Sequence, residues 1–183
     1  MLGVVLAGGA GQRMGREKAG VEVGGRPMIA WVLDALGSVA DRVVVAGRPD
    51  GWNDYPGLPD PVGMAGPLAG LAAGLELGQP VMLVAVDQPW MRVATLEKLA
   101  AVGETAVPVH DGVRQVTCAV YYPAVISKIP GQVSIQSLLD EVIPLEITEP
   151  VWRSWGEDGR SWFSVDTPEN IEEGLGRFGQ PGI

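Results

Sequence analysis

The sequence has one cysteine, one histidine and no uninterrupted apolar run approaching the about 18 residues of a membrane span. The single Cys118 excludes an intrachain disulfide and a zinc site built from cysteines. The single His110 likewise excludes a metal site built from several histidines. The start of the chain lacks the basic segment and apolar core of a secretion signal, because glycines interrupt it by Gly8. We therefore expect a cytoplasmic protein without a membrane partner.

Positive charge is also scarce. Lysine and arginine total 13 against 22 aspartates and glutamates, so the net charge is −9 and the pI is near 4.5. Such a chain is a poor candidate for nucleic-acid binding, which depends on many contacts to phosphates. An anionic ligand would have to be met locally, and Arg13, Arg16 and Lys18 gather close to the start. The length of 183 residues fits a single domain, residues 1–183.

Apolar runs alternate with helix-like segments along the chain, which predicts βαβ units and a mostly parallel sheet with helices on both faces. The expected extended segments are Gly3–Leu6, Arg42–Ala46, Val81–Val86, Thr105–Val109, Cys118–Tyr122, Val142–Ile147 and Trp162–Val165. The expected helices are Pro27–Val39, Pro67–Leu77, Val93–Ala101, Ser134–Glu141 and Pro168–Phe178. The class is α/β, in which ligands bind beyond the carboxyl ends of the strands.

The richest motif lies at Leu2–Gly20, LGVVLAGGAGQRMGREKAG, where a short strand runs into a glycine loop. It matches neither the Walker A pattern nor the dinucleotide fingerprint, because a Ser or Thr after Lys18 and a third glycine at Met14 are missing. Glycines nevertheless allow successive backbone N–H groups to surround an anion. Arg13 offers a planar fork for phosphate oxygens, and Lys18 a mobile charge. A plain glycine turn with solvated cations is the alternative.

Two aspartates are candidate ligands for a hard cation such as Mg²⁺. Asp87 directly follows the most apolar strand, and it could serve either as a metal ligand or as the cap of the next helix. Asp166 precedes Thr167 and Pro168, a pattern that also marks the start of a helix. A carboxylate together with triphosphate oxygens is a usual way to hold Mg²⁺.

Five segments in order resemble the molybdenum cofactor guanylyltransferases, within the wider group of nucleotidyltransferases. They are LAGG-x-G-x-R-M-G-x-x-K at Leu6–Lys18, GPLAG at Gly66–Gly70, VAVDQP ending at Pro89, VHDGVRQVTCAVY at Val109–Tyr121 and FSVDTPENI at Phe163–Ile171. The likeness covers nearly the whole chain, and the first motif is highly specific for nucleotidyl transfer. It implies a single nucleotidyltransferase domain with a Rossmann-like, GT-A-like fold.

The resemblance also implies a reaction. GTP would bind with its base over Leu6, Ala7 and Gly8, and its phosphates along Gly9–Arg13. The terminal phosphate of molybdopterin would attack the α-phosphorus, releasing pyrophosphate and forming the guanine dinucleotide cofactor. Proteins that make the cofactor or receive it are possible partners. The implied catalytic residues are Arg13, Lys18 and Asp87, and the nucleotide contacts are Leu6, Ala7, Gly8, Gly9, Gly11, Arg13, Lys18, Asp60, Gly66 and Asp87. The implied Mg²⁺ ligand is Asp87, and Asp166 is a second candidate ligand because an acid there could approach the metal directly.

Some residues depart from the family pattern. Ser164 and Asp166 stand where asparagines are common, and Asp60 matches an aspartate upstream of GPLAG only with a shift of one residue. The segment Asp87-Gln88-Pro89 also occurs in relatives that use CTP, whereas Gly8 leaves room for the exocyclic amino group of guanine. CTP as donor, or a sugar or polyol phosphate as acceptor, remains an alternative, as does a nucleotide-binding module without turnover.

Side chains elsewhere carry weaker predictions. His110 could lie on the acceptor side, Asp111-Gly112 is expected to form a hairpin turn, and Cys118 is expected to pack in the core. Arginines and tryptophans near the C-terminus could receive an anionic, planar pterin, although packing of this segment explains them equally well. They are Trp152, Arg153, Trp155, Arg160 and Trp162.

Overall fold

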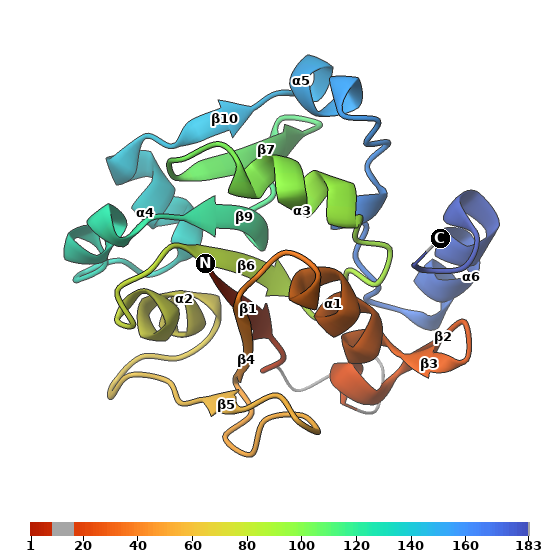
Figure 1. Ribbon diagram of the computed structural model, residues 1–183, viewed down its shortest axis with the longest axis horizontal. Helices are drawn as coiled ribbons and strands as arrows, with labels where there is room; N and C mark the ends of the chain where they lie inside the picture. Colours follow the sequence, from red (N-terminus) through yellow and green to blue (C-terminus); the bar gives the residue numbers. More distant parts are fainter. Residues whose placement is uncertain (9–16, 183) are drawn as a thin grey trace.

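The computed structural model describes residues 1–8 and 17–182, and an eight-stranded sheet runs through it (Figure 1). Seven strands lie in the order β10-β7-β9-β6-β1-β4-β5, and the short β8 pairs with β7. The strands are β1 (Leu2–Leu6), β4 (Arg42–Ala46), β5 (Gly57–Leu58), β6 (Val81–Ala85), β7 (Ala106–His110), β8 (Val113–Arg114), β9 (Cys118–Tyr121) and β10 (Leu145–Ile147).

The sheet is mostly parallel, as predicted. β1 pairs in parallel with β4 and β6, β4 with β5, and β7 with β10. Only β9 and the short β8 run the other way among these strands, since β9 is antiparallel to both β6 and β7. The inner strands β1, β4 and β6 are covered on both faces, which explains why they are continuous apolar runs in the sequence.

Helices cover both faces of the sheet, again as predicted. One face carries α1 (Met28–Gly37), α3 (Val93–Ala100) and α5 (Glu149–Ser154), and the other carries α2 (Pro67–Leu75) and α4 (Ile135–Val142). Successive strand residues alternate between two cores: Val5 packs in the first and Val4 in the second, both fully buried. Burying a side chain of this size stabilises the fold by about 1.5–3 kcal/mol relative to exposure. Among the described residues, no helix combines the length and hydrophobicity needed to cross a bilayer.

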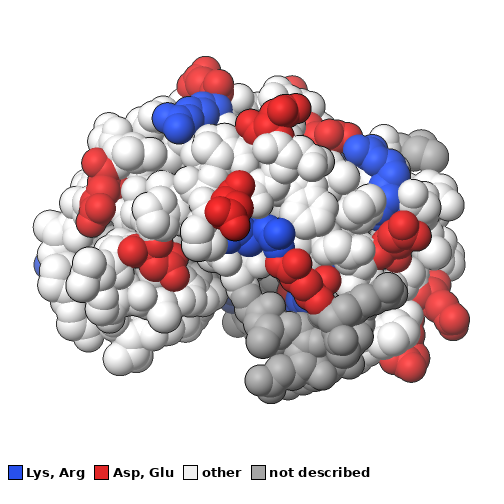
Figure 2. Space-filling model, turned by 90° about the horizontal axis from the view of Figure 1, so that it is seen from below, with Lys and Arg blue, Asp and Glu red and all other residues white. Residues whose placement is uncertain are grey.

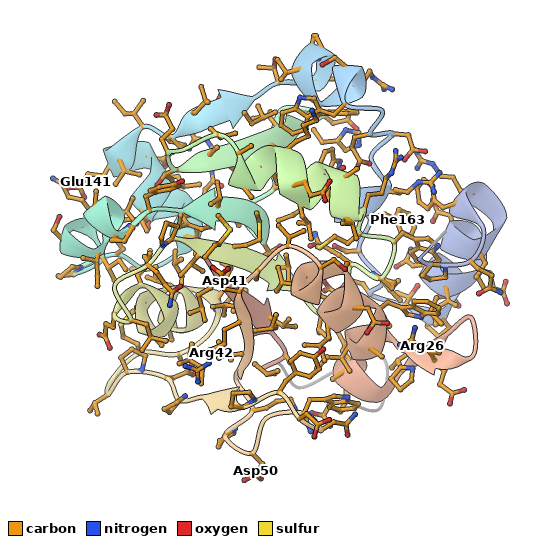
Figure 3. The ribbon with its side chains drawn as sticks, viewed as in Figure 1. Arg26, Asp41, Arg42, Asp50, Glu141 and Phe163 are labelled. Atoms are coloured by element: carbon orange, nitrogen blue, oxygen red, sulfur yellow. The ribbon has the colours of Figure 1, made fainter. Side chains whose placement is uncertain are left out.

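A smaller unit lies at one side of the sheet, at the right of Figure 1. Its elements are the hairpin strands β2 (Glu22–Val23) and β3 (Arg26–Pro27) and the last helix α6 (Pro168–Phe178). The buried Trp90 joins this unit to the sheet, with its ring 5.7 Å from that of Phe163 and 6.0 Å from that of Phe178. Phe163, labelled in Figure 3, belongs to the segment that leads from α5 to α6. Through this unit, the segment that precedes α6 packs next to the residues that follow β6.

The segment Trp162–Val165 is not a strand, which corrects the prediction. Trp162 ends a short 3₁₀ helix, η3 (Arg160–Trp162), and the N–H of Val165 donates to the carbonyl of Asp87 at 2.8 Å. Trp162 is buried in the first core, whereas Phe163 and Val165 pack in a third cluster with Trp90, so the apolar pattern reflects burial without sheet pairing. The other short 3₁₀ helices are η1 (Lys18–Gly20) and η2 (Pro123–Lys128).

The predicted hairpin turn at Asp111-Gly112 is confirmed, and it closes β7 onto β8. The two turn residues have φ values of 49° and 74°, the positive pair that suits a two-residue hairpin. In that hairpin Val109 pairs with Arg114. The next strand, β9, then enters the sheet between β6 and β7. Cys118 on β9 is fully buried, and burial raises the pKa of its thiol, in keeping with the predicted packing role.

Candidate active site

Three neighbouring strands, β1, β4 and β6, end at the same edge of the sheet. Leu6 lies opposite Ala46 of β4 and Ala85 of β6. The N–H of Ala7 donates to the carbonyl of Ala46 at 2.9 Å, and the N–H of Val86 donates to the carbonyl of Leu6 at 3.1 Å. The segments that follow these strands therefore leave the sheet side by side, at the edge where ligands bind in this fold class.

Two of these segments touch backbone to backbone at Gly8 and Gly47. A Cβ on Gly8 would lie 2.9 Å from the Cα of Gly47, and a Cβ on Gly47 would lie 2.4 Å from the Cα of Gly8. Gly47 also has a φ of 80°, which side chains other than glycine rarely adopt. The contact gives Gly8 a structural reason to lack a side chain, in addition to the room for a base that the sequence suggested.

A cavity of about 300 Å³ opens beside this glycine contact. Four of its lining residues are predicted nucleotide contacts: Leu6, Gly8, Asp60 and Gly66. Ala46, Gly47 and Pro67 complete the described lining, and they were not predicted. The signal for Gly47 is a glycine directly after an apolar strand. Ala7 is buried in the core at 6% exposure and lies outside this described lining.

The GPLAG motif places the start of α2 at this cavity. Gly66 has a φ of 76° and precedes Pro67, the first residue of the helix. Gly70 lets the helix approach the strand ends closely, because a Cβ there would lie 2.6 Å from Leu6 Cδ2 and 2.9 Å from Ala46 Cβ. The positive end of the α2 dipole thus faces the cavity lined by Gly8 and Gly47, an arrangement that favours an anion.

On the β6 side of β1, Lys18 meets two aspartates. Its Nζ donates to Asp87 Oδ2 at 2.9 Å and to Asp166 Oδ1 at 2.6 Å. The side chains of Lys18 and Asp87 are 22% and 21% exposed, and that of Asp166 is 47% exposed. Lys18 and Asp87, which had to lie close together for the predicted site to exist, are in direct contact.

The pKa of Lys18 shows how this cluster is balanced. Burial lowers the pKa, but the hydrogen bonds to Asp166 and Asp87, together with the charges of both, raise it above the ordinary value of 10.5. Because the folded pKa is the higher one, the ion pairs stabilise the fold fully below the ordinary pKa and are lost as the pH rises through the folded value. At neutral pH Lys18 is a cation and cannot accept a proton.

Backbone contacts hold the two aspartates in place. The carbonyl of Asp87 accepts the N–H of Val165 at 2.8 Å, so the segment before α6 is tied directly to the segment after β6. The side chain of Asn170, in the first turn of α6, accepts the N–H groups of Asp166 and Thr167, both at 3.1 Å. Asp166 is therefore positioned both by the start of α6 and by the neighbouring strand end.

The chemistry of this cluster suits a hard divalent cation. Two carboxylates, Asp87 and Asp166, converge on a single cationic atom, and oxygen donors are the ligands that Mg²⁺ prefers. The described residues hold another group of possible ligands, His110, Asp111 and Glu149, with atoms within 4.8 Å of one another. There Asp111 is 84% exposed and Glu149 is paired with an arginine at 2.6 Å. That group contains none of the predicted metal ligands.

Two of the tryptophans near the C-terminus serve packing. Trp152 and Trp162, 0% and 5% exposed, lie edge to face with ring centroids 5.1 Å apart, and the ring of His110 lies beside both. Arg153 pairs with Glu149. For Trp152 and Trp162, the structure displays the packing that the sequence offered as one of two explanations.

A wider groove of about 490 Å³ lies between α1, the start of α3 and the end of the chain. Arg26, Arg92 and Arg160 line it. Each already has a partner in the protein: Arg26 pairs with Asp34, Arg92 donates to a backbone carbonyl and Arg160 pairs with Asp158. Of the predicted site residues that the structure describes, only Arg160, a candidate for receiving the pterin, lines this groove, and none of the predicted catalytic, nucleotide-contacting or metal-ligating residues does. We therefore place the candidate site at the smaller cavity. Gly9, Gly11 and Arg13 lie outside the described residues.

The sheet has one reversed inner strand, and its carboxyl edge carries a glycine-lined cavity and two aspartates that share a lysine. This combination defines an α/β nucleotidyltransferase fold. A solved structure agrees: molybdopterin-guanine dinucleotide biosynthesis protein A from Archaeoglobus fulgidus superposes with a TM-score of 0.80. It covers 95% of this chain and 96% of that chain at 23% identity. The chain belongs to the family of MobA-like NTP transferase domains, whose model matches residues 3–144.

Curated relatives point the same way. A molybdenum cofactor guanylyltransferase of Rhodobacter capsulatus is 39% identical over 118 residues, which cover 59% of this chain and 60% of that protein. A relative from Pelotomaculum thermopropionicum, described as a probable molybdenum cofactor guanylyltransferase, is 32% identical over 92% of this chain and 89% of its own length. The predicted resemblance is thus confirmed at the level of the family.

Proposed function

We propose that this chain transfers GMP from GTP to the terminal phosphate of molybdopterin, with Mg²⁺ as cofactor. In this reaction an oxygen of the acceptor phosphate bonds to the α-phosphorus of GTP, and the bond to the β-phosphate breaks to release pyrophosphate. The observation that supports it best is the contact of Lys18 with both Asp87 and Asp166, at the same sheet edge as a cavity that the predicted nucleotide contacts line. The names of the relatives supply the choice of GTP and of the acceptor.

The cavity at the carboxyl ends of β1 and β4 would bind the guanine base of GTP. Its walls at Gly8 and Gly47 are bare backbone, so a planar ring can lie against them without meeting a side chain. Asp60 lines the same cavity and offers a carboxylate. Guanine presents an N–H and an amino group side by side, and a carboxylate can accept from both. Cytosine presents only its amino group there, so Asp60 would favour guanine.

The charged cluster would handle the phosphates. Asp87 and Asp166 would hold the divalent cation, which when bound neutralises charge on the triphosphate oxygens. Lys18 stays protonated at neutral pH, so its ammonium can offset the charge that develops at the attacked phosphorus. A phosphate acceptor is already ionised near neutral pH, and the residues need only position it and balance its charge. This matches a site whose described charged side chains are a lysine and aspartates.

The function is tested by supplying purified protein with Mg²⁺, molybdopterin and each of the four ribonucleoside triphosphates. We expect pyrophosphate release with GTP and with none of the other three triphosphates, together with a product whose mass is that of the guanine dinucleotide cofactor. A preference for CTP would overturn the choice of nucleotide and support the alternative that Asp87-Gln88-Pro89 suggests. Binding of GTP without any pyrophosphate release would instead support a module without turnover.

The same proposal treats residues 1–183 as one nucleotidyltransferase domain. Both main core clusters pack on the single large sheet, and the smaller unit of β2, β3 and α6 contacts that sheet through Trp90. One cooperative unfolding transition, seen alike by far-ultraviolet circular dichroism and tryptophan fluorescence, is the expected result. Two separated transitions would indicate independent units.

A further inference from the structure

Glu157 carries a buried carboxylate that the candidate site does not use. The residue is 3% exposed, and among the described residues no lysine or arginine forms a salt bridge with it. A buried charge without an ion pair is costly unless hydrogen bonds satisfy it. The sequence offers no signal for such a role, because Glu157 stands in a polar, glycine-containing segment where acids are usually solvated.

Five hydrogen bonds satisfy this carboxylate. The backbone N–H groups of Asp158, Gly159 and Ser161 donate to Oε1 at 3.0, 2.8 and 3.4 Å. The hydroxyl groups of Thr95 and Ser161 donate to Oε2, both at 2.5 Å. The loop of residues 157–161 is therefore folded around the side chain of Glu157.

The same hydrogen bonds attach this loop to the start of α3. Thr95 lies in the first turn of α3, which has no acidic residue of its own. The residue that caps the helix, Arg92, donates its N–H to the hydroxyl of Ser161 at 3.0 Å and its guanidinium to the carbonyl of Gly156. A carboxylate at the N-terminus of a helix is favoured by the helix dipole. Glu157, which is 62 residues from Thr95 in the sequence, thus supplies the negative charge that the first turn of α3 lacks.

Both ends of this attachment lead directly to the candidate metal ligands. Asp87 stands five residues before Arg92, and Asp166 stands five residues after Ser161. The two segments, 87–92 and 161–166, are joined at one end by the bond between Arg92 and Ser161 and at the other by the bond from Val165 to the carbonyl of Asp87. The two segments form a closed frame that carries Asp87 and Asp166, and Lys18 lies between these two acids.

We propose that Glu157 is a positioning residue for Asp87 and Asp166. By holding loop 157–161 on α3, it sets the spacing at which the two carboxylates can meet one divalent cation. The inference rests on the proposed function for the role of the two acids, whereas the frame itself rests on the hydrogen bonds alone. A misplacement of about 1 Å in such a site is enough to lower a rate by about 100-fold.

The decisive comparison is between Glu157→Ala and Glu157→Gln. Alanine removes every acceptor, so we expect kcat to fall by about 10- to 100-fold and the half-saturating Mg²⁺ concentration to rise, with KM for GTP changed by less than about 3-fold. Glutamine keeps an oxygen for the backbone N–H groups and can donate its amide hydrogens to the two hydroxyls. We therefore expect Glu157→Gln to stay within about 5-fold of the wild type in kcat, since hydrogen bonding is retained while the charge is lost.

A second measurement reports on the frame without any turnover. Hydrogen exchange of the Val165 amide, whose proton is bonded to the Asp87 carbonyl, should quicken by about 10-fold or more in Glu157→Ala, whereas amides of β1 and β4 should not change. The exposed Glu173→Ala on α6 is the matched control and should leave both readouts unchanged. Should Glu157→Ala not fold, Thr95→Val removes a single hydroxyl donor of nearly the same shape and should show a smaller change of the same kind.

A folded Glu157→Ala with the exchange rate and Mg²⁺ dependence of the wild type would overturn the proposal. If the wild type transfers no GMP but the exchange of Val165 still rises in the variant, the proposed function fails and the frame stands. A loss of activity in both variants, with exchange rising across the whole sheet, would mean that Glu157 supports the fold in general and would also count against a positioning role.

Discussion

The two sides of the β1 strand end are built by different means. Toward β4, the cavity is made of backbone and small residues, and Gly8 and Gly47 are in contact where a side chain on either would collide. Toward β6, the cluster is made of charged side chains, with Lys18 between Asp87 and Asp166. One side excludes side chains, and the other depends on them.

The two sides also differ in how far apart their residues are in the sequence. The described cavity lining comes from residues 6–67, all within the first part of the chain. Lys18 and Asp166 are 148 residues apart, and their meeting depends on the frame that ties α3 to the segment before α6. Figure 2 shows separate acidic groups scattered over the face that it displays, with basic residues beside some of them. Substitutions should therefore affect the two sides in distinguishable ways.

The largest effect is expected on the charged side, from Asp87→Ala. Removing this carboxylate should lower GMP transfer by about 100-fold or more, the scale of losing one electrostatic group at a reacting centre. The rate of pyrophosphate release under saturating GTP is the measurement. The control is Asp50→Ala, an exposed residue at the edge of the molecule in Figure 3, which should behave as the wild type. Full activity of Asp87→Ala would place the metal elsewhere.

On the glycine side, Gly8→Ala should act through the backbone. Its Cβ would lie 2.9 Å from the Cα of Gly47, so one of the two segments must move. We expect a loss of about 1–3 kcal/mol in the free energy of unfolding, and weaker GTP binding. Denaturant titration and calorimetry with GTP measure the two effects. Gly20→Ala meets no atom within 4 Å and is the matched control; equal behaviour of the two variants would contradict the backbone contact.

Lys18→Met should separate metal binding from turnover. With the ammonium removed, two carboxylates face each other without the cation that now lies between them. We expect Mn²⁺, used as a probe in the absence of nucleotide, to bind about 10-fold more tightly than in the wild type, while GMP transfer falls. Titration followed by electron paramagnetic resonance gives the affinity. Weaker Mn²⁺ binding would show that the two aspartates do not form one cation site.

The smallest effect should come from Asp60→Asn. Asp60 is exposed at the mouth of the cavity, so its hydrogen bonds to a base compete with water. We expect KM for GTP to rise by about 3- to 10-fold, with kcat and the free energy of unfolding unchanged. Steady-state kinetics with GTP and CTP measures this change. A variant that discriminates between the two nucleotides as well as the wild type would remove Asp60 from base recognition.

The predictable part of the fold is the part whose pattern is local. β4 matches the expected Arg42–Ala46, because a short run of apolar residues is typical of a buried strand. α6 matches the expected Pro168–Phe178, because a proline marks the start of the helix. The two-residue strands β2, β3, β5 and β8 were not predicted, since their pairing is decided by neighbours. The error at Trp162–Val165 has the same origin, because burial against Trp90 imitates a strand.

The candidate site divides in the same way. Asp87 could be singled out because a carboxylate directly after a buried apolar strand needs a partner such as a metal ion or a helix N-terminus. Asp166 could be singled out because it stands in a motif of the family at a position where asparagine is common. That Lys18 binds both acids could not be deduced from the sequence, which suggested only that it would lie beside phosphates. Glu157 could not be predicted from the sequence, because its hydrogen-bond donors come from α3 and from its own loop and meet only in the folded protein.

The position of Asp166 has a consequence for how the protein is made. The family model ends at residue 144, and Asp166 lies beyond it, on the segment that leads into the last helix. At about 5–20 residues per second, a ribosome needs several seconds to pass from Asp87 to Asp166. In a growing chain, the residues that line the cavity are therefore synthesised well before Asp166. On the proposed function, the growing chain therefore has both metal ligands only after residue 166 has been added.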